Sequence, residues 1–379
     1  MSPDNDSIIS ALETTGKFEA LREIPGGANA YAFACRHKHL NRDVFLKIYH
    51  FVEGMENDVL REPRSLVEAT KDPSGCPNLV QVFDTDVITI GSERYVCLQM
   101  EFVHGESLLK GLQRVNIGQQ DAIRIVSGIS NGVAHLHSKQ MLHRDLKPAN
   151  ILLDNMMPKI ADFGSVAILQ GDQSSVSASK HSALYVPPEG WKDPSIYTKA
   201  SDLYQIGMVL YELVNGPLNN DDKHYLTRGA LRQLKQDGKE FDSLDDFEKS
   251  RCVNSCIAEL SIKGKLLEKG RPHCPYYSAK IARLVRVATQ PDPQKRHGSV
   301  LEFLGALTKI DVPNWIASAE NEFFAGSWRG WDWRLRIVQK RSRCDIVLER
   351  SRLDQQNWRR YPGMAFNSAS DAFIFVENQ

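Results

Sequence analysis

The sequence predicts an α+β protein of two lobes with an added module at its C-terminal end. Up to about residue 100, short apolar runs alternate with turns, which is typical of antiparallel strands. From residue 119 apolar residues recur at helical spacing, and after residue 311 strand-like composition returns. We therefore expect a flexible lead-in, a small β-rich lobe, a larger helical lobe and a small β-rich appendage, over residues 1–16, 17–103, 104–310 and 311–379.

Bulk composition limits the classes of partner and compartment. The 47 basic residues equal the 47 acidic ones, so no net charge points to a polyanionic partner. The seven cysteines are odd in number and scattered, which is typical of a reducing compartment. Cys252, Cys256 and Cys274 with His273 fit no zinc spacing, so buried helix cysteines are the simpler interpretation. Without a signal-peptide pattern or an apolar run of about 18 residues, we expect a cytoplasmic protein with no membrane contact.

The first lobe contains a glycine turn and a lysine within an apolar strand. Strands are expected near 18–21, 31–35 and 44–49, followed by two more near 79–83 and 95–100. Gly26 and Gly27 lie in the first turn, where backbone amides without a Cβ can approach phosphate oxygens. Lys47 lies within the third strand, and burying its ammonium requires an anionic partner.

The chemistry-bearing stretch runs from residue 143 to residue 164. Asp145, Lys147 and Asn150 lie in one short loop, an apolar run follows, and Asp162 opens a second loop. A magnesium–phosphate site needs hard oxygen ligands for the metal and an acceptor for the proton of an incoming hydroxyl. The two carboxylates and the amide among these side chains provide both.

The same stretch resembles a known family. Residues 143–150 read His-Arg-Asp-Leu-Lys-Pro-Ala-Asn and residues 162–164 read Asp-Phe-Gly. This resembles the catalytic and metal loops of Hanks-type serine/threonine protein kinases. The resemblance implies that Asp145 takes the hydroxyl proton, that Lys147 steadies the γ-phosphate, and that Asn150 and Asp162 hold Mg²⁺.

The resemblance also assigns the nucleotide contacts. Lys47 would contact the α- and β-phosphates and pair with a helix glutamate, for which Glu62 is favoured over Glu56 and Glu68. Pro63 should kink that helix or begin it. The turn that holds the two glycines resembles the family's glycine-rich loop. The backbone of the hinge would bind adenine, through Met100, Glu101 and Val103.

Three further features match the helical lobe of the family. Residues 162–189 resemble an activation segment, and Arg144 would dock a phosphate on its serines. Asp202, near the start of an apolar helix over 201–213, would anchor the catalytic loop. Arg296 would pair with Glu189. The charged residues 237–249 suggest a solvent-facing insertion.

Taken together, the resemblance implies an enzyme that transfers the γ-phosphate of ATP to protein serine or threonine with Mg²⁺. Lys147 favours serine/threonine over tyrosine specificity, and autophosphorylation is expected in the activation segment. A small-molecule kinase, or a nucleotide-binding scaffold whose tail is the binding module, is the alternative. The substrate and the oligomeric state do not follow from the sequence.

The tail after residue 311 concentrates aromatic and basic residues. It holds five of the six tryptophans, and residues 329–360 carry ten Lys or Arg against four acids. Such interleaving can bind single-stranded nucleic acid, although stacked arginines on a solvated ribbon are commoner, so nucleic acid remains an open, less favoured partner. Strands are expected at 333–338, 345–349 and 373–376. Because about 70 residues build only a thin core, we expect the tail to dock on the helical lobe.

Overall fold

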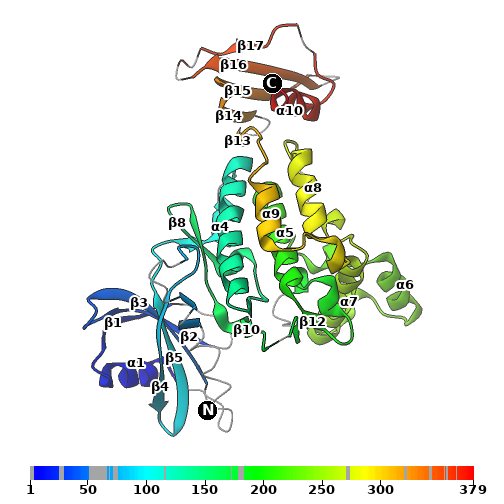
Figure 1. The fold of residues 1–379 in the computed structure, drawn as a ribbon. Coiled ribbons are helices and arrows are strands. Elements are labelled where there is room, and N and C mark those ends of the chain that lie inside the picture. Colours follow the sequence, from blue (N-terminus) through cyan, green and yellow to red (C-terminus); the bar gives the residue numbers. More distant parts are fainter. Residues whose placement is uncertain are drawn as a thin grey trace.

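The computed structural model describes most of the chain as three parts in a row. A small β-lobe, a helical lobe and a terminal sheet follow one another, with the helical lobe in the middle (Figure 1). The terminal sheet lies beyond the ends of helices α4 (Gln119–Ser138) and α8 (Ala279–Ala288), on the side away from the β-lobe. The described residues are 4–24, 30–50, 66–67, 69–70, 76–114, 117–171, 173–177, 183–269, 274–319, 322–340, 344–353, 355, 357–363 and 365–379.

The β-lobe is an antiparallel sheet of five strands in the order β1-β2-β3-β5-β4. Four of the five predicted strands are confirmed, and Gly91 makes the tight β4–β5 turn with φ +63°. The strand expected near 79–83 is wrong in both bounds, because β4 begins at Val82 and continues to Ile90, while Leu79 forms an isolated bridge to Ile160 of the helical lobe. The strands are β1 (Phe18–Glu23), β2 (Tyr31–His37), β3 (Arg42–His50), β4 (Val82–Ile90) and β5 (Glu93–Glu101).

The expected loose lead-in is wrong for most of its length. Residues Asn5–Thr14 form helix α1, which Asp4 caps by accepting a hydrogen bond from the Ser7 N–H. Ile8 and Leu12 lie one helical turn apart and are fully buried in the core cluster that also holds sheet residues. Ile8 and Leu12, at i and i+4, thus form the buried side of this helix, and Ile9 and Ala11 pack partly against the same cluster.

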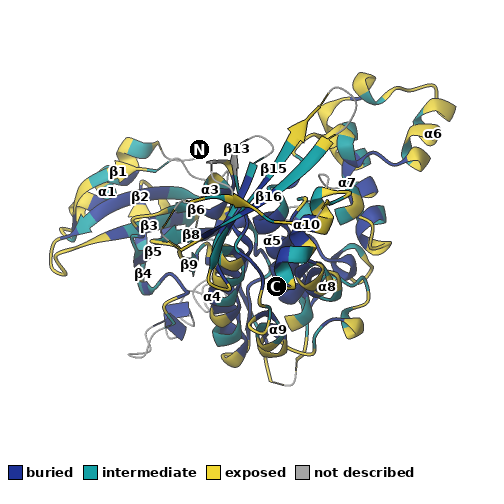
Figure 2. Ribbon diagram, turned by 90° about the horizontal axis from the view of Figure 1, so that it is seen from above, coloured by how far each residue is buried: buried dark blue, intermediate teal, exposed yellow. Residues whose placement is uncertain are grey.

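The helical lobe is built around α4 (Gln119–Ser138) and α5 (Lys199–Asn215), both predicted from their apolar spacing and both confirmed. The predicted insertion over 237–249 leads into α7, and Figure 2 shows neighbouring α6 as a largely exposed projection. The remaining helices are α3 (Leu108–Arg114), α6 (Arg228–Gln236), α7 (Asp246–Ile262), α8 (Ala279–Ala288) and α9 (Val300–Leu307). Short strands complete the lobe: β6 (Glu106–Ser107), β7 (Met141–Leu142), β8 (Ile151–Asp154), β9 (Met157–Ile160), β10 (Ala167–Ile168), β11 (Val176–Ser177) and β12 (Ile196–Tyr197).

The structure also bears on the cysteines, on membrane-spanning helices and on metal sites. All seven cysteines are free thiols. Among the described residues, no helix is long and apolar enough to cross a bilayer. In the same part of the chain, no group of three or more His, Cys, Asp or Glu could by itself hold a metal ion.

The tail forms an antiparallel sheet with one helix. Strands predicted at 333–338 and 345–349 are confirmed, but the strand predicted at 373–376 is wrong, because this segment lies in α10. Phe373 and Val376 are buried while Ile374 is exposed, so burial follows a helical period, and Ser368 caps the helix. The elements are β13 (Ile316–Ala319), β14 (Glu322–Trp328), β15 (Trp331–Gln339), β16 (Cys344–Arg352), β17 (Arg359–Arg360) and α10 (Ala369–Glu377).

The tail docks on the helical lobe, as its composition predicts. Tyr276, just before α8, packs edge-on against Phe323 and Phe373, with ring centroids 5.7 and 5.8 Å away. The Glu377 carboxylate accepts hydrogen bonds from the Ser278 hydroxyl and the Lys280 ammonium, at 3.2 and 3.0 Å. The sheet and α10 therefore have a hydrophobic core of their own, and Tyr276 of the helical lobe is buried in it.

Val376→Ala should test the core of the tail, of which Val376 is a member. Val376 is fully buried, and deleting two methyl groups there should lower the free energy of unfolding by roughly 2 kcal/mol. Ile374→Ala, two residues away on the exposed side of α10, should change it by less than about 0.5 kcal/mol. Thermal unfolding of both variants measures the difference, and equal melting temperatures would contradict the packing.

Candidate active site

The catalytic loop brings three of the predicted side chains together. The Asp145 carboxylate accepts hydrogen bonds from the Lys147 ammonium at 2.9 Å and from the Asn150 amide nitrogen at 3.0 Å. The same nitrogen donates to the Asp145 carbonyl at 2.8 Å. Because Asn150 uses its nitrogen in this way, its side-chain oxygen is the atom left for a metal ion, which suits Mg²⁺.

Asp202 anchors this loop, as predicted. It is fully buried at the start of α5 and accepts hydrogen bonds from the backbone N–H groups of His143 and Arg144, at 3.0 and 2.8 Å. His137 Nε2 lies 2.8 Å from the same carboxylate. Burial acts to raise the pKa of Asp202, but these partners outweigh it and hold the pKa below its usual value. The anchor is thus a carboxylate that stays ionised.

Gln205 is a second anchor that sequence reasoning missed. Its amide nitrogen donates to the Arg144 carbonyl at 3.0 Å, and its oxygen accepts from the Leu146 N–H at 2.9 Å. Arg144 has φ +71°, a left-handed conformation that a side chain disfavours, so the loop needs this support. The sequence did contain a signal for this second anchor, namely a glutamine three residues after Asp202 in an apolar helix. Buried polar groups need hydrogen-bond partners, so such a glutamine indicates a specific contact.

The metal loop follows β9 and carries Asp162 in a left-handed conformation, with φ +56°. Its carboxylate forms an ion pair with the Lys47 ammonium from β3 and accepts a hydrogen bond from the Gly164 N–H at 3.2 Å. Burial acts to raise the pKa of Asp162, but Lys47 and the Gly164 N–H together bring it below its usual value. The two loops and the β-lobe lysine thus form one charged site.

Some predicted nucleotide contacts lie outside the described residues. These are Gly26 and Gly27 of the glycine turn and the glutamates proposed for Lys47, Glu62 first among them with Glu56 and Glu68. Asp162 is the partner that the structure gives Lys47.

The predicted hinge joins β5 to the helical lobe. Met100 and Val103 are buried in the main hydrophobic cluster, which includes residues of both lobes. The Glu101 carboxylate pairs with the Lys159 ammonium of β9 at 2.9 Å, and the Glu101 N–H donates to the Gln81 carbonyl. The Lys159 contact was not predicted, because the two residues are far apart in sequence.

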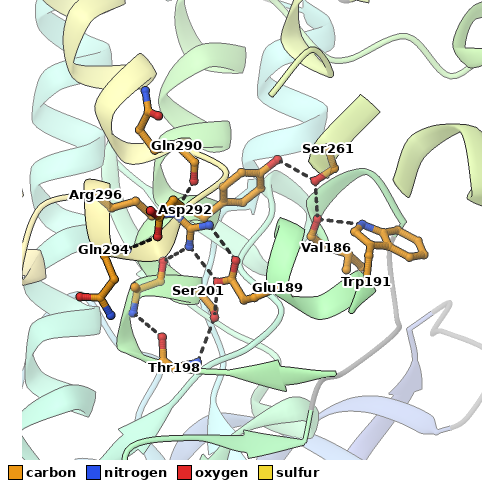
Figure 3. A network of polar contacts seen from close by, with 12 residues as sticks. Val186, Glu189, Trp191, Thr198, Ser201, Ser261, Gln290, Asp292, Gln294 and Arg296 are labelled. Atoms are coloured by element: carbon orange, nitrogen blue, oxygen red, sulfur yellow. Dashed lines mark hydrogen bonds and ion pairs between the residues drawn. The ribbon is translucent and has the colours of Figure 1, made fainter. Parts of the chain in front are cut away.

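The end of the activation segment is fixed by the predicted ion pair (Figure 3). Two nitrogens of Arg296 donate to the two carboxylate oxygens of Glu189, at 2.8 and 2.7 Å. The Ser201 hydroxyl donates to the same carboxylate at 2.7 Å, and the guanidinium packs over the Tyr204 ring. The Arg296 side chain is fully buried, so the pair is shielded from solvent.

A second buried carboxylate supports the same segment and was missed. Glu212 on α5 accepts hydrogen bonds from the Tyr185 hydroxyl at 2.5 Å and the Leu218 N–H at 2.8 Å. Burial raises the pKa of Glu212 to about 7. The sequence signal for this site was a charged residue inside an apolar helix. The signal did not name its partner Tyr185, which lies 27 residues away.

Glu212 predicts a specific pH dependence of stability. The pKa of Glu212 is about 7 in the folded protein and 4.5 when the chain is unfolded, so the folded protein binds the Glu212 proton more tightly. The contribution of this proton to the free energy of unfolding is therefore complete below pH 4.5. It is lost as the pH rises through 7, and amounts to roughly 3 kcal/mol. Melting temperatures from pH 5 to 8 should therefore fall less steeply for Glu212→Gln than for the wild type. Parallel curves would contradict the burial of this charge.

Comparisons with known proteins agree with this geometry. The protein kinase domain family matches residues 18–305, more than half of the chain. The serine/threonine-protein kinase PrkC of Bacillus subtilis is 32% identical over 228 residues, which cover 58% of this chain and 34% of that protein. The serine/threonine-protein kinase pkn2 of Myxococcus xanthus is 29% identical over 290 residues, or 73% of this chain and 33% of that protein. The chain spans about a third of the length of these relatives. By its catalytic loops and this match, the chain belongs to the protein kinase domain family.

Proposed function

We propose that this chain transfers the γ-phosphate of ATP to serine and threonine hydroxyls of proteins. The observation that carries the proposal is the convergence of Lys147 and Asn150 on the Asp145 carboxylate. Both relatives described above are named as serine/threonine kinases, which supports the same residue preference.

The nucleotide side of the site would bind and orient ATP. The Asn150 oxygen and the Asp162 carboxylate would hold Mg²⁺, which neutralises charge on the β- and γ-phosphates when bound. Lys47 would contact the α- and β-phosphates, in exchange for or beside its present contact with Asp162. The glycine turn at Gly26 and Gly27 would cover the phosphates. Adenine would lie against the hinge, at Met100, Glu101 and Val103.

The hydroxyl side of the site would carry out proton transfer. Asp145 would accept the proton of the substrate hydroxyl as the new O–P bond forms. Lys147, 2.9 Å from this carboxylate, would stabilise the negative charge of the transferred phosphoryl group. Because both groups sit in a loop that Asp202 and Gln205 fix, little reorganisation is needed during the reaction.

The Glu189–Arg296 pair favours a protein substrate over a small molecule. It fixes the end of the activation segment on the helical lobe, where a peptide would lie. The segment is also tied by β11, which pairs with β12. We propose that serines of this segment are autophosphorylated and that Arg144 then contacts the phosphate. The candidates are Ser174, Ser175, Ser177, Ser179 and Ser182.

Incubation of the full chain with Mg-ATP and casein, followed by mass-spectrometric mapping of phosphosites, tests this function. We expect phosphoserine and phosphothreonine on casein, and phosphoserine within residues 170–182 of the chain itself. ATP binding without any transfer would favour the nucleotide-binding scaffold. Transfer to small hydroxyl compounds alone would favour a small-molecule kinase.

A further inference from the structure

The kinase family match ends at residue 305, so it assigns nothing to the terminal sheet. The strand register places three arginines of this sheet on one face. Arg350 on β16 lies directly opposite Arg359 on β17, and Arg352 lies two residues further along β16, opposite Trp331. Residues opposite one another, and residues two apart on a strand, share a face. We call Arg350, Arg352 and Arg359 the arginine triad.

Within the described part of the chain, the triad has no acidic partner, unlike the other face of the sheet. On that face Arg334 and Arg336 both pair with the Glu349 carboxylate, at 2.9 and 3.0 Å. By contrast, the three guanidinium groups of the triad donate no hydrogen bond and form no ion pair with any described residue. Like charges directly opposite one another destabilise a sheet, so a bound anion would relieve this repulsion.

Arg350, the central residue of the triad, is already ordered by stacking on two aromatic rings. Its guanidinium lies 4.2 Å from the Trp331 ring centroid and 4.8 Å from that of Tyr361. Tyr361 is itself packed by Trp333 and Phe375, at 5.7 and 5.1 Å. Stacking on rings leaves the in-plane N–H donors of an arginine available, and a side chain already ordered loses less entropy on binding.

The size of the triad indicates the kind of anion. Opposite residues on neighbouring strands are about 5 Å apart at Cβ, and residues two apart along a strand are about 7 Å apart. Three donors this close suit the oxygens of one phosphate dianion, whereas an extended nucleic acid needs a track of charges. We propose that the arginine triad is a binding site for phosphoserine or phosphothreonine in a peptide. The peptide source, though not the phosphate site, rests on the proposed kinase activity.

The position of the sheet indicates what such a site does. The terminal sheet and the β-lobe lie at opposite ends of the helical lobe (Figure 1), so the triad is remote from the catalytic loop. Helix α10 covers the same sheet face further along the strands, through Phe373 against Phe323. The triad would therefore hold a phosphorylated protein, such as a substrate or a second copy of this chain, while the catalytic site stays accessible.

Fluorescence anisotropy with the full chain tests the site. The probe is a labelled peptide of residues 170–180 with phosphoserine at position 175, compared with its unphosphorylated twin and a 12-nucleotide oligo-dT. The Asp145→Asn variant serves as the background, without ATP, so the result does not depend on phosphotransfer. We expect the phosphopeptide to bind at least ten-fold more tightly than its twin, and 10 mM inorganic phosphate to compete.

Substitutions locate the binding to the triad. Arg359→Gln on the exposed edge strand and Arg350→Gln should each weaken phosphopeptide binding about ten-fold or more. Arg336→Gln, on the opposite face, should leave it within two-fold, and melting temperatures report whether each variant folds. Equal binding of the two peptides, or equal effects of Arg359→Gln and Arg336→Gln, would overturn the proposal. Tighter binding of oligo-dT with a steep salt dependence would instead identify a nucleic-acid site.

Discussion

Asp145→Asn should lower the rate of phosphotransfer by about 10³-fold or more and leave the affinity for Mg-ATP nearly unchanged. A positioned general base contributes about 10²–10⁴-fold, and here the same carboxylate also holds Lys147 and Asn150 in place. Asparagine keeps the shape of the side chain but loses the charge and the basic oxygen. Steady-state kcat and calorimetric titration of Mg-ATP measure the two quantities separately.

Two further variants should be compared with Asp145→Asn in the same assays. Asp162→Asn should abolish transfer and weaken Mg-ATP binding as well, because it removes a metal oxygen and the partner of Lys47. Asp154→Asn, on β8, should stay within two-fold of the wild type, because its carboxylate contacts only Asn155 among the described residues. A rate for Asp145→Asn close to that of the wild type would refute the assignment of the base.

The left-handed residues of the site explain why its loops need so many anchors. Arg144 and Asp162 both have positive φ, which costs roughly 1–3 kcal/mol for a residue with a side chain. The Arg144 N–H donates to Asp202, the Arg144 carbonyl accepts from Gln205, and the Asp162 carboxylate accepts from the Gly164 N–H; these hydrogen bonds offset the strain. For Arg144, the stabilising partners Asp202 and Gln205 therefore lie outside the motif, on α5.

The sequence predicts those parts of the site whose residues are close together in the chain, or whose partner the family resemblance names. Asp145, Lys147 and Asn150 lie within six residues of one another, so their convergence needs only one loop. Long-range partners such as Lys159 for Glu101, or Tyr185 for Glu212, could not be named, because many polar residues compete for each role.

The errors in the fold have a related cause. Helices α1 and α10 are each short, and only two or three buried apolar residues define them. The strand at 373–376 was predicted from composition, because Phe, Ile and Val are typical of strands and four residues are too few to show a period. Phe373 of α10 packs against Trp315 and Phe323 of the tail and against Tyr276 of the helical lobe, and no local pattern contains these contacts.

Arg296→Ala should lower the free energy of unfolding by about 3–5 kcal/mol, because it leaves the Glu189 carboxylate buried without its cation. The melting temperature should fall by about 6 °C or more. Phosphorylation of a protein substrate should fall with it, since the end of the activation segment loses its support. Thermal unfolding and casein phosphorylation measure the two effects.

The neighbouring Lys295 provides the matched control. Its side chain is 71% exposed and lies 4.0 Å from Asp292, so Lys295→Ala should change the unfolding free energy by less than about 0.5 kcal/mol. Adding Glu189→Gln to Arg296→Ala removes the unpaired charge, and should restore part of the lost stability. If the double variant is no more stable than Arg296→Ala, the loss comes from the packing of the guanidinium over Tyr204 and not from the buried charge.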